Sequence, residues 1–188
     1  PRLLESGKTK AIYHKTVLTQ GVPESMIAER IEEWENALPE NIKLAYLPNP
    51  MSVRLRLSAR GENESSLRAL VENEILKLQQ IIPENIFGFG TETLAEVIGR
   101  ELKLNGKTLA VAESCTGGYI SHLITSVAGS SEFFKGSVTA YSNQIKENIL
   151  AVKNSTLTEF GAVSEQVAKE MALGAKQILN SDYSIATT

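Results

Sequence analysis

The amino-acid sequence predicts a chain of two parts, a small α+β domain over residues 1–87 and an α/β domain over residues 88–188. In the first part, period-two and period-3.6 apolar patterns follow one another in the order β-α-β-β-α. In the second part, short apolar strands alternate with amphipathic helices, which predicts a largely parallel sheet flanked by helices. A glycine-rich stretch, "IFGFG", lies between the two parts and predicts a flexible connection.

The first part is predicted to begin with a strand over residues 8–20, which are rich in Thr, Val, Ile and Tyr. A helix follows over residues 22–38, whose apolar residues repeat at helical spacing. These residues are Met26, Ile27, Ile31, Trp34 and Leu38. Residues 42–48 and 52–60 alternate apolar and polar side chains around a Pro-Asn-Pro turn, so they predict two strands. A second amphipathic helix over residues 64–82 completes a domain whose helices pack on one face of a sheet.

The second part is predicted from a regular alternation of helices and strands. Its helices are expected over residues 91–106, 116–129, 143–152 and 164–179. Its strands are expected over residues 107–114, 136–143 and 183–188. In an α/β layer of this kind, ligands bind beyond the carboxyl ends of the strands, so residues that follow a strand are the first candidates for a site.

Composition and charge limit the class of protein. Hydrophobic residues make up 42% of the 188 residues and charged residues 22%, as in an ordinary globular protein. The net charge of −3 argues against a broadly basic nucleic-acid binder, so nucleic acid is an unlikely partner. No apolar run approaches the about 20 residues that cross a bilayer, so no membrane association is expected. The single cysteine, Cys115, cannot form an internal disulfide and favours a cytoplasmic location.

Both ends of the sequence predict a fragment of a longer protein. The chain begins at Pro1 without a methionine, and it ends in "SDYSIATT", an apolar strand pattern that stops in mid-run. We therefore expect that any site near the carboxyl terminus is incomplete.

The stretch "AESCTGG", residues 112–118, connects a predicted strand to a predicted helix. Its glycines allow a tight turn and a close approach of a ligand, and the amides of a helix N-terminus attract anions. The residues alone leave two interpretations open. One is a phosphate or oxyanion site that uses the hydroxyls of Ser114 and Thr116, and the other is a plain turn with one of these residues as a helix cap.

A second group of polar residues follows within residues 127–146. Ser131, Tyr141 and Lys146 are the residue types of a serine nucleophile activated by a lysine base through a phenol. The lysine requires a lowered pKa to act in this way. The ordinary interpretation stays open, with Ser131 as a cap, Tyr141 as a sheet aromatic and Lys146 as a surface cation.

Other candidate sites have simpler explanations. No Cys/His cluster has metal-ligand spacing, so no metal is expected. Cys115 at a helix start would form a reactive thiolate, but its neighbours predict burial. His122 is interpreted as a surface or capping residue of its helix. The basic stretch "VRLRLSARG" fits nucleic acid, and it fits the solvent face of a sheet equally well.

Several motifs in order carry a resemblance to a known family. The second part contains "AESCTGG", "AGSS", "YSN" followed two residues later by Lys146, and "GAVSE". From about residue 91 onward it resembles the C-terminal domain of the CinA (competence/damage-inducible) family. The first part, with "PESMIAERIEEWENALPENIKLAYLPNPMSVRLRLSARG", resembles the KH-type α+β segment in the middle of long CinA proteins.

The resemblance implies an enzyme that hydrolyses the carboxamide of nicotinamide mononucleotide to nicotinate mononucleotide and ammonia, without a cofactor. Matched motif by motif, Ser131 is the expected nucleophile, Lys146 the general base and Tyr141 the accompanying phenol. The expected substrate-binding residues are Ser114, Thr116, Gly117, Gly118, Asn143 and Thr188. A homodimer is also expected.

The resemblance also defines an alternative. Long CinA proteins carry an N-terminal domain with ADP-ribose pyrophosphatase activity, and their C-terminal domain continues into a "GIAGP"-type loop and a later arginine. This sequence contains none of these segments. The chain would then be an inactive fragment that serves as an interdomain, dimerisation or nucleic-acid-binding module.

Overall fold

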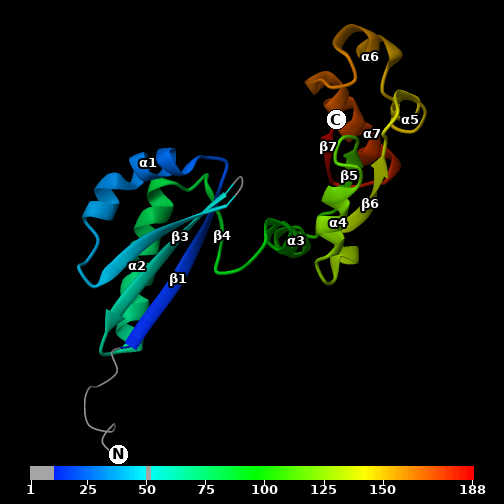
Figure 1. Cartoon of the computed structure of the whole chain (residues 1–188). Helices are drawn as coiled ribbons and strands as arrows, with labels where there is room; N and C mark the ends of the chain where they lie inside the picture. Colours follow the sequence, from blue (N-terminus) through cyan, green and yellow to red (C-terminus); the bar gives the residue numbers. More distant parts are fainter. Residues whose placement is uncertain (1–10, 50–51) are drawn as a thin grey trace, which may run out of the picture. The chain divides into compact units, whose positions relative to one another are not determined.

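The structure, a computed structural model, describes residues 11–49 and 52–188 and divides the chain into two compact units, Pro1–Leu94 and Ala95–Thr188 (Figure 1). Residues 8–10 of the first predicted strand and residue 50 of the predicted turn lie outside the described residues. Each unit has its own sheet and its own hydrophobic core. No helix in the described ranges is long and apolar enough to cross a membrane.

The first unit is an antiparallel sheet covered by two helices. Its elements are β1 (Ala11–Gln20), α1 (Glu24–Asn36), β2 (Ile42–Asn49), β3 (Ser52–Gly61), α2 (Glu64–Ile81) and β4 (Ile86–Phe89). The strand order is β2-β3-β1-β4, and neighbouring strands pair antiparallel. Asn63 caps α2 by accepting hydrogen bonds from the amides of Ser65 and Ser66 at 2.8 and 3.3 Å.

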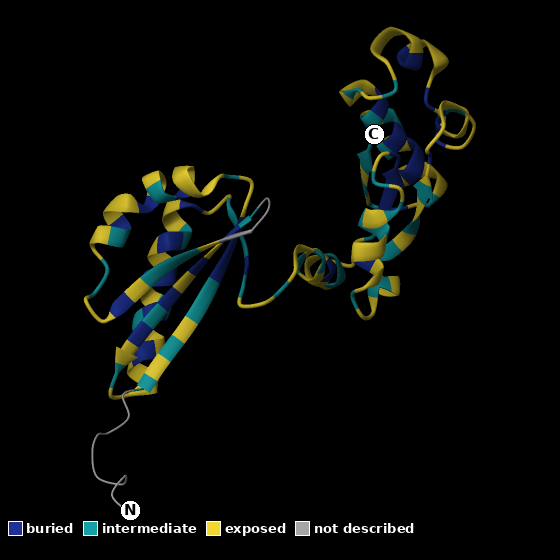
Figure 2. Ribbon diagram, in the orientation of Figure 1, coloured by how far each residue is buried: buried dark blue, intermediate teal, exposed yellow. Residues whose placement is uncertain are grey.

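The alternation in β3 positions the core of the first unit. Val53, Leu55 and Leu57 are buried, whereas Arg54 and Arg56 are exposed (Figure 2). The buried side of the sheet packs against apolar residues of both helices, among them Ile27, Ile31, Trp34, Val71, Ile75 and Leu78. This part of the chain therefore confirms the predicted α+β arrangement with helices on one face.

The connection between the units differs from the prediction. The glycine-rich stretch expected to be a flexible connection forms β4, whose residues Gly88 and Phe89 pair with Leu18 and Val17 of β1. Because β4 belongs to the first sheet, the structure divides the chain into compact units between Leu94 and Ala95.

The second unit is an α/β layer with a parallel sheet. Its elements are α3 (Leu94–Leu104), β5 (Leu109–Glu113), α4 (Tyr119–Thr125), the 3₁₀ turn η1 (Ser130–Glu132), β6 (Phe134–Thr139), α5 (Asn143–Asn148), α6 (Asn154–Phe160), α7 (Glu165–Ile178) and β7 (Tyr183–Thr187). The strand order is β6-β5-β7, and β5 pairs in parallel with both neighbours. The expected fold class is thus confirmed.

Helices cover both faces of this sheet. Ala110 and Ala112 of β5 face a core that includes Met171 and Ala175 of α7. Leu109 and Val111, on the opposite face, pack with Ile124 of α4, Phe133 and Leu102. The sheet edge where the strands end, the carboxyl edge, therefore lies between these two helical layers, as in other open α/β sheets.

The predicted helix over residues 143–152 is too long. In the structure α5 ends at Asn148, and Ala151 has a φ of 56°, a left-handed conformation that no helix continues through. The amide of Val152 donates to the carbonyl of Lys146 at 3.0 Å, which closes the turn. The following helix α6 was missed, because "NSTLTEF" is mostly polar and buries only Thr156 and Leu157.

Candidate functional site

The carboxyl edge of the second sheet gathers most of the predicted site residues. The "AESCTGG" loop follows β5, and Tyr141 and Asn143 follow β6. Thr188 follows β7, which pairs with β5 in register from Leu109–Tyr183 to Glu113–Thr187. Parallel strands end at one edge, so segments about 70 residues apart in sequence meet here. One such contact joins the hydroxyls of Thr116 and Thr187 at 2.7 Å.

Lys146 is a buried lysine at this edge. It lies in α5 and is 2% exposed. Its Nζ donates to Oγ1 of Thr188 at 2.6 Å and to the carbonyl of Ala162 at 3.5 Å, and Oγ1 of Thr188 donates to the same carbonyl at 2.7 Å. No ion pair joins Lys146 to a carboxylate within the described residues. Burial lowers the pKa of Lys146, and the nearby Cys115 opposes this shift only in part.

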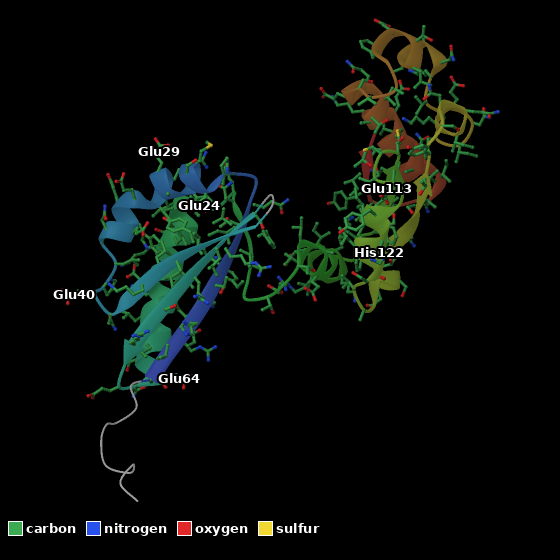
Figure 3. The ribbon with its side chains drawn as sticks, in the orientation of Figure 1. Glu24, Glu29, Glu40, Glu64, Glu113 and His122 are labelled. Atoms are coloured by element: carbon green, nitrogen blue, oxygen red, sulfur yellow. The ribbon has the colours of Figure 1, made fainter. Side chains whose placement is uncertain are left out.

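Glu113 is the buried carboxylate that organises the loop, and sequence reasoning missed it. Its side chain is fully buried at the end of β5 and accepts four hydrogen bonds. Oε2 accepts from the amides of Gly118 and Ile120 at 3.1 and 2.9 Å. Oε1 accepts from the amide and the hydroxyl of Ser121 at 2.8 and 2.5 Å. Figure 3 labels Glu113 beside α4, at the amino end of the helix.

The negative charge of Glu113 is favourable at the amino end of α4. Burial alone raises the pKa of Glu113, but the hydrogen bonds from Ser121 and Ile120 more than offset it, so the pKa lies below its usual value. The carboxylate is therefore ionised and complements the positive end of the helix dipole. A glutamate just before a glycine turn and a helix start was the available signal in the sequence.

Glu113 changes what the "AESCTGG" loop offers to a ligand. The amide of Gly118 donates to Glu113, and the amide of Gly117 donates to the carbonyl of Ser114 at 3.0 Å. These two amides are therefore occupied within the chain. The amides of Cys115 and Thr116 donate to no acceptor in the described part of the chain. Any anion at this loop would meet those two amides rather than the first turn of α4.

The other predicted residues at the carboxyl edge differ in exposure. The side chain of Ser114 is buried at 7% exposed, whereas Tyr141 is 78% exposed. Asn143 is exposed at the first position of α5. Ser142 caps this helix by accepting a hydrogen bond from the amide of Ile145 at 3.3 Å. The carboxyl edge thus combines a buried lysine, a buried serine and an exposed phenol.

Ser131 lies at the opposite edge of the sheet. It is exposed in η1, which precedes β6, whereas Tyr141 and Lys146 follow that strand. The six residues of β6 separate Ser131 from Tyr141 by roughly 20 Å, because a strand rises about 3.3 Å per residue. Within one chain, Ser131 therefore does not meet Lys146.

Cys115 and His122 are the other two candidates from the sequence. Cys115 is exposed, so the expectation that its neighbours bury it was wrong. Between Cys115 and α4, Gly117 and Gly118 have left-handed φ values of 59° and 104°. His122 is exposed on α4 and stacks on Tyr119 with 6.2 Å between ring centroids, as expected for a surface residue. Among the described residues, no group of three or more metal-ligating side chains is arranged to hold a metal ion.

Comparisons with known protein families agree with this architecture of a small antiparallel α+β unit followed by a parallel α/β unit. Residues 91–188 match the family described as CinA C-terminal domain, and residues 14–88 match the damage-inducible protein CinA KH domain. The chain belongs to the CinA family.

Similar proteins carry the same family name. A CinA-like protein of Flavobacterium psychrophilum is 48% identical over 189 residues, which cover 100% of this chain and 45% of that protein. One of Amoebophilus asiaticus is 44% identical over 186 residues, covering 98% of this chain and 45% of the relative. The chain thus spans about 45% of these curated relatives.

A solved CinA superfamily structure from Escherichia coli aligns with a TM-score of 0.48 and 34% identity over 49% of this chain and 54% of that one.

Proposed function

We propose that the second unit is the catalytic part of an amidohydrolase that converts the carboxamide of nicotinamide mononucleotide to a carboxylate and ammonia. The family resemblance supplies the substrate. The observation that carries the reaction type is Lys146, a buried amine with a lowered pKa at the carboxyl edge of a parallel sheet. Buried lysines of this kind serve as general bases, because a neutral amine is available at moderate pH.

The contacts of Lys146 suit a neutral amine. A neutral amine has two N–H donors and one lone pair. The carbonyl of Ala162 and the hydroxyl of Thr188 accept the two donors. The lone pair is then left to accept a proton from a nucleophile. A carboxylate beside the amine would instead favour the charged form, and none forms an ion pair with Lys146 in the described residues.

The proposed reaction has two stages. A serine Oγ attacks the carboxamide carbon, and its proton passes to Lys146, directly or through the phenol of Tyr141. The resulting tetrahedral intermediate expels ammonia, which takes the proton from Lys146 and leaves an acyl ester on the serine. A water molecule then attacks the ester, its proton returns through Lys146 to the serine, and the carboxylate product departs.

The negative oxygen of the intermediate requires hydrogen-bond donors. The amides of Cys115 and Thr116 are the donors of the loop that have no other acceptor in the described residues. Glu113 holds the loop in shape through the amides of Gly118 and Ile120. Gly117 and Gly118 are therefore proposed to shape the loop without contacting the substrate through their amides. Ser114, Asn143 and Thr188 are proposed to contact the substrate through their side chains.

The family resemblance identifies the nucleophile, and the geometry limits how this serine can reach Lys146. Ser131 is the proposed nucleophile, and it lies at the edge opposite Lys146 of the same chain. The proposal therefore requires the expected homodimer, in which Ser131 of one copy reaches Lys146 of the other. Ser114 is the alternative nucleophile, because it is buried at the same edge as Lys146.

Ammonia release from nicotinamide mononucleotide tests this proposal, measured on this chain and on a longer CinA-like relative. Ser131→Ala and Lys146→Met are each expected to lower kcat by at least about a hundredfold. Ser130→Ala and Lys153→Met are the matched controls, because they make the same changes at neighbouring positions. Full activity of folded Lys146→Met would refute the lysine base, and full activity of Ser131→Ala with loss in Ser114→Ala would move the nucleophile to Ser114.

A further inference from the structure

The turn between α6 and α7 contributes directly to the surroundings of Lys146. Ala162 lies in this turn, and its carbonyl accepts a hydrogen bond from Oγ1 of Thr188 at 2.7 Å. The same carbonyl accepts from Nζ of Lys146 at 3.5 Å. Because Lys146 comes before α6 in the sequence and Ala162 comes after it, the position of α6 influences where this carbonyl meets the amine.

Helix α6 depends on its neighbours for its position. It has seven residues, whereas isolated helices shorter than about 12–15 residues are marginal in water. Only Thr156 and Leu157 of this helix are buried, so apolar packing anchors it weakly. Figure 1 shows α6 as the outermost helix of the second unit. Specific polar contacts must therefore hold it in place.

Glu170 of α7 supplies two of these contacts. Its Oε2 accepts from the amide of Lys153 at 2.8 Å, and its Oε1 accepts from the hydroxyl of Thr156 at 2.9 Å. Lys153 is the N-cap residue of α6, and its own side chain makes no capping hydrogen bond. A carboxylate from another helix therefore takes the role of the cap, and hydrogen bonds to a carboxylate are about twice as strong as those between neutral groups. Glu170 thus fixes the first turn of α6 to α7.

The other end of α6 is joined to α7 at one point. The hydroxyl of Ser164, the N-cap residue of α7, donates to the carbonyl of Gly161 at 2.9 Å and accepts from the amide of Val167 at 3.3 Å. This bond fixes the carbonyl of Gly161, but the direction in which α6 enters the turn depends on its first turn. The turn that carries Ala162 therefore needs both attachments to keep its place.

Glu170 does not act on Lys146 through its charge. Burial is the main cause of the lowered pKa of Lys146, and Cys115 is the titratable group that acts on the amine among the described residues. No ion pair joins Glu170 to Lys146 in the part of the chain that the structure describes. Any influence of Glu170 on Lys146 must therefore pass through the position of α6 and of the turn that follows it.

We propose that Glu170 is a positioning residue for Lys146, which holds the carbonyl of Ala162 at the amine by anchoring α6 to α7. The inference rests on the proposed function for its catalytic consequence, because Lys146 is the proposed base. Without the carboxylate of Glu170, α6 shifts and water reaches the amine in place of the carbonyl. The amine then keeps an acceptor but loses part of its burial.

Glu170→Ala removes both acceptors at the start of α6. Because burial is the main cause of the lowered pKa of Lys146, water at the amine should raise this pKa. The rise of kcat/KM for ammonia release should then move to higher pH by about half a unit or more, a loss of roughly threefold below the pKa. A pH–rate profile measures this shift, which a general loss of stability would not produce.

Three further variants define the cause of the shift. Glu170→Gln keeps an oxygen for the amide of Lys153, and its NH₂ group can donate to the hydroxyl of Thr156, so its profile should stay close to that of the parent chain. Thr156→Val removes one of the two bonds at nearly constant shape, so it should shift the profile less in the same direction. It also carries the test if Glu170→Ala does not fold. Glu159→Ala makes the same truncation at an exposed position of α6 and should leave the profile unchanged.

The pKa of Lys146 is also measurable without activity, by NMR titration of protein labelled with ¹³C-lysine, in which the Lys146 signal is assigned from its absence in Lys146→Met. We expect a raised pKa in Glu170→Ala and parent values in Glu170→Gln and Glu159→Ala. An unchanged or lowered pKa in folded Glu170→Ala or, if that variant does not fold, in Thr156→Val would overturn the proposal, as would an equal shift in Glu159→Ala. If the pKa shifts as expected and even the parent chain releases no ammonia, the proposed function fails and the positioning role of Glu170 stands.

Discussion

Lys146 of α5 and Thr188, which follows β7, are joined by a hydrogen bond of 2.6 Å between Nζ and Oγ1. The two residues are 42 positions apart, and the bond positions a buried amine at the carboxyl edge of the sheet. The hydroxyl of Thr188 in turn donates to the carbonyl of Ala162 at 2.7 Å. Thr188 therefore orients Lys146. Its oxygen accepts more strongly from an ammonium than from a neutral amine, but burial is the larger effect and lowers the pKa of Lys146.

The pH dependence of the proposed activity should reflect this contact. The base must be neutral to act, so kcat/KM should rise with pH and level off above the pKa of Lys146. Burial lowers this pKa, so the rise should be centred below the usual lysine value of about 10.4. Thr188→Val removes an acceptor that stabilises the ammonium form, so the rise should move to lower pH.

Thr158→Val is the control, because Thr158 is exposed on α6 and donates to a helix carbonyl. A pH–rate profile of the three proteins checks the prediction. A shift to higher pH in Thr188→Val, or an equal shift in Thr158→Val, would show that Thr188 does not tune Lys146.

Glu113→Gln should destabilise the second unit strongly. The buried carboxylate accepts hydrogen bonds from three amides and one hydroxyl, and a glutamine would present an NH₂ group to some of these donors. We expect a loss of at least about 2 kcal/mol in the free energy of unfolding, since hydrogen bonds to charged groups are worth about 1.5–3 kcal/mol each. Chemical denaturation measures this loss. Glu132→Gln, at an exposed ion pair with Lys103, should cost little, and equal losses would contradict the assignment.

Gly174→Ala tests a close contact in the second core. A Cβ atom at Gly174 would lie 2.0 Å from the carbonyl oxygen of Leu150, which belongs to the backbone and cannot rotate away. Although alanine favours a helix by about 1 kcal/mol over glycine, the clash should outweigh this gain and destabilise the protein by at least about 2 kcal/mol. Leu173→Ala, at an exposed neighbouring position, is the control. A thermal melt of Gly174→Ala at or above the parent Tm would show that α7 can shift away.

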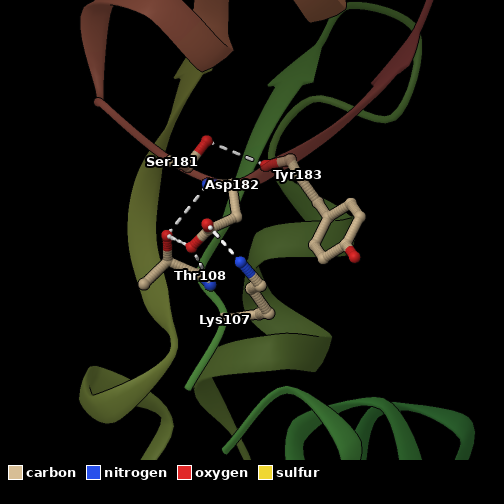
Figure 4. A network of polar contacts seen from close by, with 5 residues as sticks. All are labelled: Lys107, Thr108, Ser181, Asp182 and Tyr183. Carbon is tan, nitrogen blue, oxygen red and sulfur yellow. Dashed lines mark hydrogen bonds and ion pairs between the residues drawn. The ribbon is translucent and has the colours of Figure 1, made fainter. Parts of the chain in front are cut away.

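The amino ends of β5 and β7 are joined by Asp182, whose contacts with Thr108 and Lys107 appear in Figure 4. Oδ2 accepts from the amide and the hydroxyl of Thr108 at 2.9 and 2.8 Å, and Lys107 lies 3.2 Å from Oδ1. The hydrogen bonds from Thr108, with help from Lys107, lower the pKa of Asp182 to about 2.

The direction of the pKa shift of Asp182 sets the pH dependence of stability. The carboxylate favours the folded state above its unfolded pKa of about 3.9, and this contribution is lost as the pH falls toward about 2. Asp182→Asn should lower Tm by a few degrees at neutral pH and flatten the fall in Tm over this window. Glu165→Gln removes an ion pair with Lys169 in which both side chains are exposed, so it should change the acid fall in Tm much less than Asp182→Asn does. A parallel acid fall in Asp182→Asn would contradict the role of Asp182.

Sequence patterns predicted most of the fold for identifiable reasons. The alternation of Val53, Leu55 and Leu57 with arginines fixed both the strand and its buried face, and strand–helix alternation predicted the parallel sheet. The prediction failed where local patterns are weak. The sequence of β4 is short and glycine-rich, and only its pairing with β1 makes it a strand. The helix α6 is amphipathic over too few residues to be detected.

The candidate site was harder to predict, because its contacts join distant segments. Motifs identified Lys146 and Thr188 separately, but neither periodicity nor spacing indicates that their side chains touch. The capping role of Glu113 depends on a turn whose geometry the sequence does not specify. Strand β6 lies between Ser131 and Lys146, and a strand in this region was predicted from the sequence. Only the three-dimensional structure shows that this strand places the two residues at opposite edges of the sheet.

The most direct test of the central claim is the activity of a mixed dimer, made by co-expressing differently tagged Ser131→Ala and Lys146→Met chains and purifying the form that carries both tags. Each parent variant alone should be inactive. If Ser131 of one copy serves Lys146 of the other, one of the two sites in the mixed dimer is intact, so ammonia release should return to about half of the unmutated rate. An inactive mixed dimer would contradict the shared site.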